Sequence, residues 1–357
     1  MSTGYSQTPK IMELALELEA DIRRKGLKPG DPYLSLAQAS KMLGVGSSAA
    51  NRALQLLSQR KILKRVQRRG TFIGSLQRES SPGLLKKVFM LVHRSYLRQE
   101  GMAADGVLVG IQSQLPGADV QFNFLPATDP ADYVNTLLGE ILRSKETAGI
   151  VITKAPFVVQ RAVKDSGLPA VVHGSLYPSI EGLAWVEQDN AGIAALVAGY
   201  VAKHGSTHVS ALTREVMYPG DDKVLQELGI LLGKAGATAD RFSISHLPDD
   251  SSAIQAEVGR LIALHPMDLC LLCRSDLKAE AALATINRLG LKGRRRPRII
   301  VSGIYKRPIG DSPYPYIFPT SRPEEIGSAI GRLIVAQVTS TTTSAGHIII
   351  PVDLTET

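Results

Sequence analysis

The chain has 357 residues, 44% of them hydrophobic, which suits one small domain and a larger body of about 270 residues. No run approaches the ~20 apolar residues of a membrane span, and acidic residues interrupt the leucines near the N-terminus, so we expect a cytoplasmic protein with no membrane partner. The formal net charge is +8; residues 1–80 hold 14 basic and 6 acidic residues, whereas residues 81–357 hold 27 of each. Because such a concentration of positive charge attracts polyanions, it favours nucleic acid as the partner of the N-terminal end.

Two short helices and a hairpin are predicted near the N-terminus. Serines stand where they can cap a helix over residues 36–43 and a second over 49–61, with a glycine break between them. Residues 62–66 and 71–73 read as the strands of a hairpin with a basic tip. A helix with short polar side chains beside a cationic hairpin is a common means of engaging a DNA groove and its phosphates. The residues expected to contact duplex DNA are Ser35, Ser47, Ser48, Asn51, Arg52, Arg68, Arg69, Gly70 and Thr71.

This segment resembles the GntR family of winged-helix regulators. The matching stretches are 11–25, 26–31, 43–45, 52–54 and 69–73. The resemblance implies a winged helix-turn-helix domain over residues 1–75, followed by a linker over 76–85. The family usually carries arginines where this chain has Ser47 and Asn51, and another where it has Ala37. Arginine reads guanine and asparagine pairs best with adenine, so we expect an operator different from the family's usual one.

From residue 86 onward, strands and helices alternate in two successive series. Strands are predicted at 88–92, 120–124, 148–152 and 169–173, and then at 208–212, 241–247, 269–273 and 298–302. Helices are predicted at 106–113, 130–144, 158–166, 192–203, 223–234, 253–264 and 277–289. Two such series predict an α/β body with two parallel sheets and a cleft between two lobes. We expect the chain to cross between the lobes near Asp189, Ser302 and Thr343.

The body resembles the ligand-binding domain of LacI-type repressors, which is similar to periplasmic sugar-binding proteins. The resemblance is carried in order by stretches 189–192, 203–205, 275–279, 300–303 and 321–330 and by a closing strand at 347–352. It implies a two-lobed, periplasmic-binding-protein-like domain over residues 86–357. It also implies a small-molecule effector between the lobes and a homodimer formed through the body.

Polar side chains at the predicted strand ends are candidates for contacting that effector. They are His93, Arg94, Tyr96, Thr153, Lys154, His173, Arg214, Lys223, Arg274, Ser275, Asp276 and Tyr305. The family usually has an arginine near the start of the second lobe, a place that Lys223 or Arg214 must take here. The aspartate that usually grips sugar hydroxyls is missing, because residues 303–307 bring a lysine and an arginine instead. Cations suit carboxylates and phosphates, so the effector is expected to be a sugar or a sugar-derived anion.

Other functional classes find less support in the sequence. Cys270 and Cys273, the only cysteines, lie in a predicted buried strand where positions i and i+3 face opposite sides, so we expect two buried thiols and neither a redox motif nor a metal site. No P-loop, HExxH or GxSxG motif occurs, so we expect neither an enzyme nor a cofactor. Three alternatives stay open: a metabolite-controlled transcriptional repressor, a DNA-binding regulator with a purely dimerising body, and, with less support, a solute-binding protein.

Overall fold

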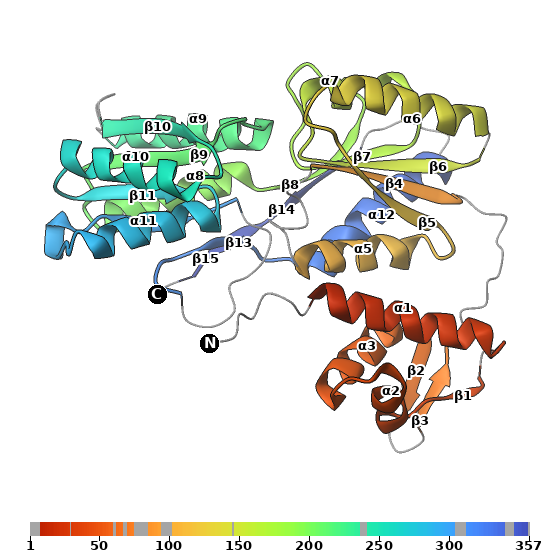
Figure 1. Cartoon of the computed structure of the whole chain (residues 1–357). Helices are drawn as coiled ribbons and strands as arrows, with labels where there is room; N and C mark the ends of the chain where they lie inside the picture. The colour runs from red at the N-terminus through yellow and green to blue at the C-terminus, as the bar shows by residue number, and fades with distance from the viewer. Residues whose placement is uncertain are drawn as a thin grey trace.

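One longer helix, two short helices and a small sheet form the N-terminal unit, drawn red to orange at the bottom of Figure 1. The computed structural model describes residues 8–28, 30–59, 62–66, 70–74, 85–93, 102–144, 146–235, 241–303, 312–339 and 346–355. The helices are α1 (Thr8–Arg24), α2 (Leu36–Leu43) and α3 (Ser47–Gln59). The strands β1 (Pro32–Tyr33), β2 (Leu63–Val66) and β3 (Gly70–Ile73) pair antiparallel in the order β1-β3-β2. The predicted helix-turn-helix and hairpin are therefore confirmed, and β1 is an addition that the sequence did not predict.

Local chemistry explains the sharp bounds of α2. The Ser35 hydroxyl accepts a hydrogen bond from the Gln38 amide (3.3 Å), and the Gln38 side chain accepts one from the Ser35 amide (2.8 Å). This capping box satisfies two amides that the first turn leaves unpaired. Gly44 ends the helix at φ 63°, a conformation that a residue with a Cβ adopts only with strain. Ala39, Leu54 and Leu57 are fully buried between the helices.

The first lobe of the body is a six-stranded parallel sheet in the order β14-β8-β7-β6-β4-β5. Its strands are β4 (Lys87–Val92), β5 (Asp119–Phe124), β6 (Ala148–Thr153), β7 (Ala170–His173), β8 (Ala184–Gln188) and β14 (His347–Ile350). Helices α5 (Met102–Gln114) and α12 (Pro323–Thr339) cover one face, and α6 (Pro130–Ser144) and α7 (Phe157–Asp165) cover the other. Strands β4, β6 and β7 are buried on both faces and read as apolar runs, so the sequence predicted them, whereas β8 was not predicted.

The second lobe repeats this design with a four-stranded parallel sheet in the order β10-β9-β11-β12. Its elements are β9 (His208–Arg214), β10 (Phe242–Leu247), β11 (Leu269–Cys273), β12 (Arg298–Val301), α8 (Asn190–Lys203), α9 (Pro219–Lys234), α10 (Ser251–Leu264) and α11 (Asp276–Arg288). Helices α8 and α9 pack on one face, and α10 and α11 on the other. Cys270 packs with the first pair and Cys273 with the second, and both thiols are free and buried, as the strand periodicity predicted.

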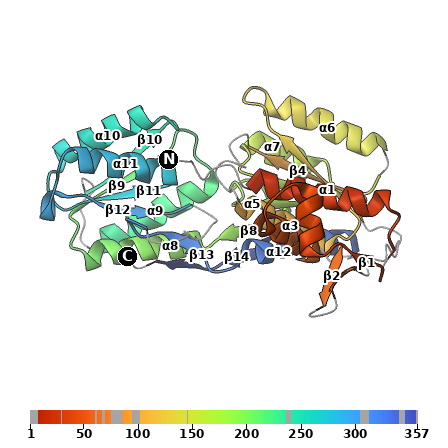
Figure 2. The same cartoon turned by 60° about the horizontal axis from the view of Figure 1, so that its bottom comes forward.

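Three chain segments connect the lobes, and Figure 2 shows β8, β13 and β14 at their junction. The first crossing lies at Asp189, as predicted. The crossing expected near Ser302 is wrong, because residues 317–319 still belong to the second lobe. They form β13 (Ile317–Pro319), which pairs with β15 (Val352–Leu354) before α12 begins. The last crossing is at Pro351 between β14 and β15, and Thr343 lies outside the described residues. Hydrogen bonds from Asp189 N to Ile350 O and from Thr320 N to Pro351 O, each 2.9 Å, tie the crossings together.

Glycines bring α5 and α12 into direct backbone contact on the first lobe. A Cβ on Gly110 would lie 2.1 Å from the Glu324 carbonyl oxygen, and one on Gly327 would lie 2.0 Å from the Val107 carbonyl oxygen. No side chain fits at either position, so these two helices pack backbone against backbone under the sheet. No helix in the described ranges combines the length and the apolar character that crossing a bilayer requires.

Candidate functional site

The first candidate surface is formed by the start of α3 and the adjacent wing strands. Ser47 and Ser48 open α3 and are exposed, as is Arg52 one turn later. The Asn51 side-chain oxygen accepts a hydrogen bond from Arg65 Nη1 of β2 (2.9 Å), so the wing is fixed against this helix. Arg65 was not among the predicted DNA contacts, although it stands in the basic strand of the predicted hairpin.

Two predicted DNA contacts have structural roles that their sequence position did not reveal. The Ser35 hydroxyl is used in capping α2. The Thr71 side chain is buried and its strand is paired on both sides, so a direct contact from this side chain to DNA is not supported. Gly70 opens β3 at φ 109°. Arg68 and Arg69, which the sequence predicts at the tip of the hairpin, lie outside the described residues.

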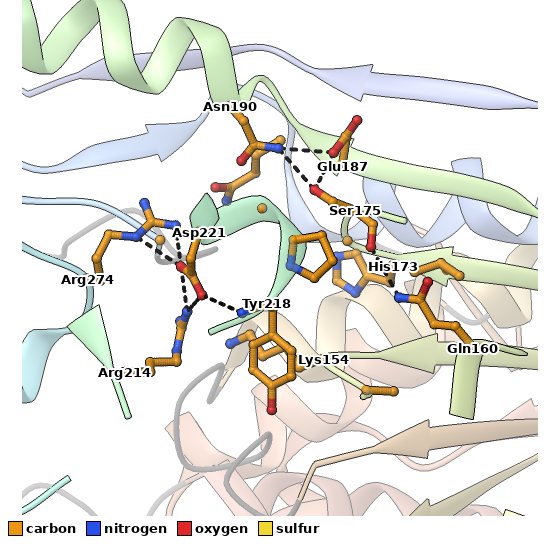
Figure 3. Close-up of a pocket in the computed structure, with 17 residues that line it drawn as sticks. Lys154, Gln160, His173, Ser175, Glu187, Asn190, Arg214, Tyr218, Asp221 and Arg274 are labelled. Atoms are coloured by element: carbon orange, nitrogen blue, oxygen red, sulfur yellow. Dashed lines mark hydrogen bonds and ion pairs between the residues drawn. The ribbon is translucent and has the colours of Figure 1, made fainter. Parts of the chain in front are cut away.

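The second candidate site is a cavity of about 70 Å³ between the two lobes (Figure 3). It is lined by residues at the carboxyl ends of β6, β7, β8, β9 and β11, which is where parallel sheets usually bind small molecules. The first lobe contributes Lys154, Gln160, His173, Ser175 and Glu187. The second lobe contributes Arg214, Tyr218, Asp221, Arg274 and Gly303, and Asn190 comes from the first crossing.

Asp221 is the centre of an ion-pair cluster within the second lobe. Its carboxylate accepts hydrogen bonds from Arg214 Nη1 (2.8 and 2.9 Å) and from Arg274 Nη2 (2.7 Å) and Nε (3.1 Å). Its side chain is 2% exposed, and that of Arg274 is 4% exposed. Burial alone raises the pKa of Asp221, but the two guanidinium groups more than offset burial and hold the pKa well below its ordinary value. The cluster therefore holds two cations against one buried anion.

Glu187, in β8, is the centre of a second cluster that spans both lobes. Its carboxylate accepts hydrogen bonds from Ser175, from Trp185 Nε1 (3.1 Å) and from Asn190 Nδ2 (3.0 Å). Lys223 of α9 reaches it from the second lobe at 3.1 and 3.2 Å. Burial raises the pKa of Glu187, but these donors and the Lys223 charge together lower it below its ordinary value. This cluster links the lobes directly.

A second, larger cavity of about 270 Å³ adjoins the first. Lys154, Arg214 and Tyr218 line both cavities; we call these three residues the waist. The remaining residues of this outer cavity are His93, Glu215, Val216, Leu247, Pro248 and Asp249. Lys154 has φ 48°, one of three left-handed non-glycine residues in the described part of the chain. Such a conformation is strained, and strained residues cluster at functional sites.

The structure brings together only some of the predicted effector contacts. His93, Lys154, His173, Arg214 and Arg274 line the cavities. The others that are described lie elsewhere: Thr153 is buried in its strand, Lys223 pairs with Glu187, Ser275 caps α11, and Asp276 is the first residue of that helix. Arg94, Tyr96 and Tyr305 are outside the described residues.

Several polar residues of the smaller cavity, which we call the inner cavity, were not predicted from the sequence. Gln160, Ser175, Glu187, Gln188, Asn190, Tyr218 and Asp221 were not predicted as contacts. The sequence did contain a signal for Asp221. Proline favours the first position of a helix, and Pro219 starts α9 four residues before the predicted start, so Asp221 lies in the first turn. Among the described residues no group of three or more His, Cys, Asp or Glu side chains is arranged to hold a metal ion.

Comparison with known proteins finds a family model that matches the N-terminal end and solved structures that share the fold of the body. Residues 10–73 match the family described as "Bacterial regulatory proteins, gntR family". No curated protein matches this sequence. Among solved structures, the transcriptional regulator CelR in complex with cellobiose has a TM-score of 0.63 at 16% identity, covering 91% of this chain and 99% of CelR.

Two LacI-family regulators have similar scores. The regulator from Silicibacter pomeroyi has a TM-score of 0.59 at 16% identity, covering 75% of this chain and 96% of its own. The regulator from Enterococcus faecium, solved with bound ribose, has a TM-score of 0.58 at 15% identity, covering 76% and 97%. At these identities the likeness shows the fold. The chain thus joins an N-terminal helix-turn-helix that matches the gntR-family model to a body with the two-lobed fold of these LacI-family structures.

Proposed function

We propose that the protein is a sequence-specific transcriptional repressor whose affinity for its operator changes when a small metabolite binds between the two lobes. Residues 1–75 bind DNA, residues 76–85 link the parts, and residues 86–357 bind the effector and form a homodimer. The effector is a sugar or a sugar-derived anion. The observation that carries this proposal is the polar cavity whose walls come from both lobes.

A ligand in that position has a physical means of controlling the body. It contacts groups on both lobes, so its affinity depends on how far the lobes are open, and it stabilises the conformation to which it binds more tightly. The three crossings that share hydrogen bonds at Asp189, Thr320 and Pro351 are the natural hinge. In a dimer, a change in lobe angle alters the spacing of the two DNA-binding units and hence the operator affinity.

The DNA-binding role rests on the exposed start of α3 and on the cationic wing. The positive charge of residues 1–80 supports contact with phosphates, and the polar residues at the start of α3 suit the edges of bases. Ser47, Ser48, Asn51 and Arg52 are proposed to face the major groove. Arg65, with Arg68 and Arg69, is proposed to meet the phosphates or the minor groove.

The test begins with selection of an operator from a random DNA pool. We expect Asn51→Ala to cost about 1–3 kcal/mol at one or two base pairs and Arg65→Ala to weaken binding to every duplex while lowering the salt dependence. Lys234→Ala, at the exposed end of α9, is the control for loss of charge alone. If Asn51→Ala selects the same operator as the wild type, the proposal that α3 lies in the major groove is wrong.

Effector control is tested on the same operator. Cellobiose, ribose and acidic sugars are added at increasing concentration while operator affinity and melting temperature are followed; we expect one of them to change affinity by about 1–3 kcal/mol and to raise the melting temperature. A second candidate function, a purely dimerising body, is favoured by one observation: the inner cavity is small, and both of its carboxylates, Asp221 and Glu187, already have cationic partners within the protein. A dimer of constant melting temperature and constant operator affinity across the panel would establish that alternative.

A further inference from the structure

We infer that the cleft opens on acidification, because two cations share the Glu187 carboxylate: Lys223, which reaches it across the gap between the lobes, and His347, which pairs with it from the same lobe once protonated. The inference concerns the hinge of the proposed function and requires no effector. It follows from the number of donors at one carboxylate and from the position of His347.

Glu187 has more hydrogen-bond donors around it than its carboxylate needs. Ser175 and Asn190 donate to Oε2, the second over 3.0 Å. Trp185 Nε1 donates to Oε1 over 3.1 Å, and Lys223 donates to both oxygens. An ionised carboxylate has about four lone-pair sites, so the other donors still satisfy it when Lys223 withdraws. What Glu187 loses when the lobes part is therefore its counter-charge.

His347 lies where it can supply that charge from the first lobe. It opens β14 opposite Trp185 of β8, and the two rings stack with their centroids 4.0 Å apart and an interplanar angle of 21°. The His347 Nε2 atom lies 3.3 Å from Glu187 Oε1, and the two form an ion pair when the imidazole is protonated. The face of an indole also attracts a cation. A protonated His347 is thus stabilised by a carboxylate and by an aromatic face.

Two cations from different lobes meet on this face of the sheet. Ile348 and Ile350 point to the opposite face, where they pack with α5 and α12, so the charged groups of those helices lie across the sheet from His347. In the described part of the chain, the charged groups that reach Glu187 are Lys223 of α9 and His347 of β14. The His347 side chain is 33% exposed, so solvent protons can reach it.

Protonation of His347 weakens the ion pair that joins the lobes. While His347 is neutral, Glu187 and Lys223 attract each other as opposite charges. Once His347 is charged, Glu187 has a cation of its own lobe, and the two cations repel each other only while the lobes are closed. Protonation therefore favours the open cleft, and opening favours protonation by the same factor. Histidine side chains change charge between about pH 5 and pH 8, so we expect opening in that range.

The experiment measures protonation and opening separately in the full-length protein, without DNA or effector. Trp185 is the only tryptophan in the chain and stacks on His347, so its fluorescence reports the charge on the imidazole. Small-angle scattering gives the radius of gyration. Both are recorded between about pH 8 and pH 5. We expect fluorescence and radius to change over the same interval, with the ratio of open to closed protein rising on the order of three- to tenfold.

Variants assign the change to the two cations. His347→Gln keeps a polar side chain that cannot be protonated, so its radius should stay at the high-pH value of the wild type. His265→Gln, at the end of α10 in the second lobe, is the matched control and should open as the wild type does. Lys223→Met should be open at every pH, because it has no ion pair between the lobes to weaken. Its fluorescence should still titrate, since His347 and Trp185 remain.

Several results would overturn the inference. They are a wild-type radius that is constant or falls on acidification, a change in radius without a change in fluorescence, and an equal change in radius for His347→Gln and the wild type. If His347→Gln does not fold, Lys223→Met is decisive: a radius that still rises on acidification in this variant shows that another group opens the cleft. A wild type that opens on acidification, while no metabolite changes operator affinity, would leave this inference standing and refute the proposed function.

Discussion

The cleft contains two buried carboxylates whose partners differ in one respect. Asp221 binds Arg214 and Arg274, which belong to its own lobe, whereas Glu187 binds Lys223 across the gap between the lobes. Opening the cleft would leave the first cluster intact and break the ion pair of the second. One buried ion pair therefore stabilises a lobe, while the other responds to the angle between lobes. Similar clusters in one site can thus serve folding and conformational control separately.

The largest effect is expected from breaking the cluster within the lobe. Asp221→Ala leaves two arginines without their buried counter-charge, which should lower the free energy of unfolding by about 3 kcal/mol. Chemical denaturation followed by circular dichroism measures the loss. Asp165→Ala removes an exposed ion pair with Arg161 and should change stability by no more than about 0.5 kcal/mol. Equal losses for both variants would contradict the structural role given to Asp221.

The same carboxylate should leave a pH signature. Because the folded pKa of Asp221 is depressed, its stabilisation is fully present above the unfolded pKa of about 4 and is lost as pH falls below that value. The stability of Asp221→Asn should therefore fall less steeply than that of the wild type in this acidic range. Parallel curves for the two proteins would argue against an ionised carboxylate at this position.

A smaller effect separates backbone strain from charge at the rim of the cleft. Lys154→Gly and Lys154→Ala both lose the ammonium, but only alanine keeps the strain at φ 48°, so the glycine variant should be more stable by about 1 kcal/mol. At Lys164, in helical conformation on α7, the order should reverse by up to about 1 kcal/mol. Thermal unfolding of the four variants shows whether glycine is more stable than alanine at position 154 and less stable than alanine at position 164.

The smallest effect on stability, and the largest on shape, is expected from the pair that joins the lobes. Lys223 is 44% exposed, so solvent screens its pairing, and Lys223→Met should cost only about 0.5 kcal/mol. The lobes should nevertheless open more, which small-angle scattering detects as a larger radius of gyration. Lys234→Met on the same helix is the control. If Lys223→Met has the same radius of gyration as the control, the ion pair between Glu187 and Lys223 does not control the hinge.

Sequence reasoning succeeded where a local pattern determined the structure. The predicted helices over 36–43 and 130–144 have the observed bounds, since a capping serine marks the first and the spacing of apolar residues marks the second. The crossing expected at Ser302 failed because β13 has three residues and depends on β15, 35 residues later in the chain. A pairing so short and so distant leaves little trace in local composition.

The site was predictable to a similar degree. Cations at strand ends, such as Lys154 and Arg274, could be found because a parallel sheet gathers its strand ends at one edge. Asp221 and Glu187 could not be identified in this way, since their importance comes from partners far away in the chain, such as Arg274, 53 residues from Asp221. The sequence contained the charges, but only the fold shows which of them pair within a lobe and which pair between lobes.

The two thiols of β11 can report when the helices that cover the second lobe detach from its sheet. The chain has no other cysteine, and Cys270 and Cys273 face opposite helix layers, where burial raises the pKa of Cys270 to about 12 and that of Cys273 further. A thiol reagent can reach either sulfur only after the covering layer detaches. The labelling rate of Cys270 would therefore measure how fast α8 and α9 detach, and the labelling rate of Cys273 how fast α10 and α11 detach. Slower labelling in the presence of an effector would report, without any introduced probe, how far binding in the cleft steadies the lobe behind it.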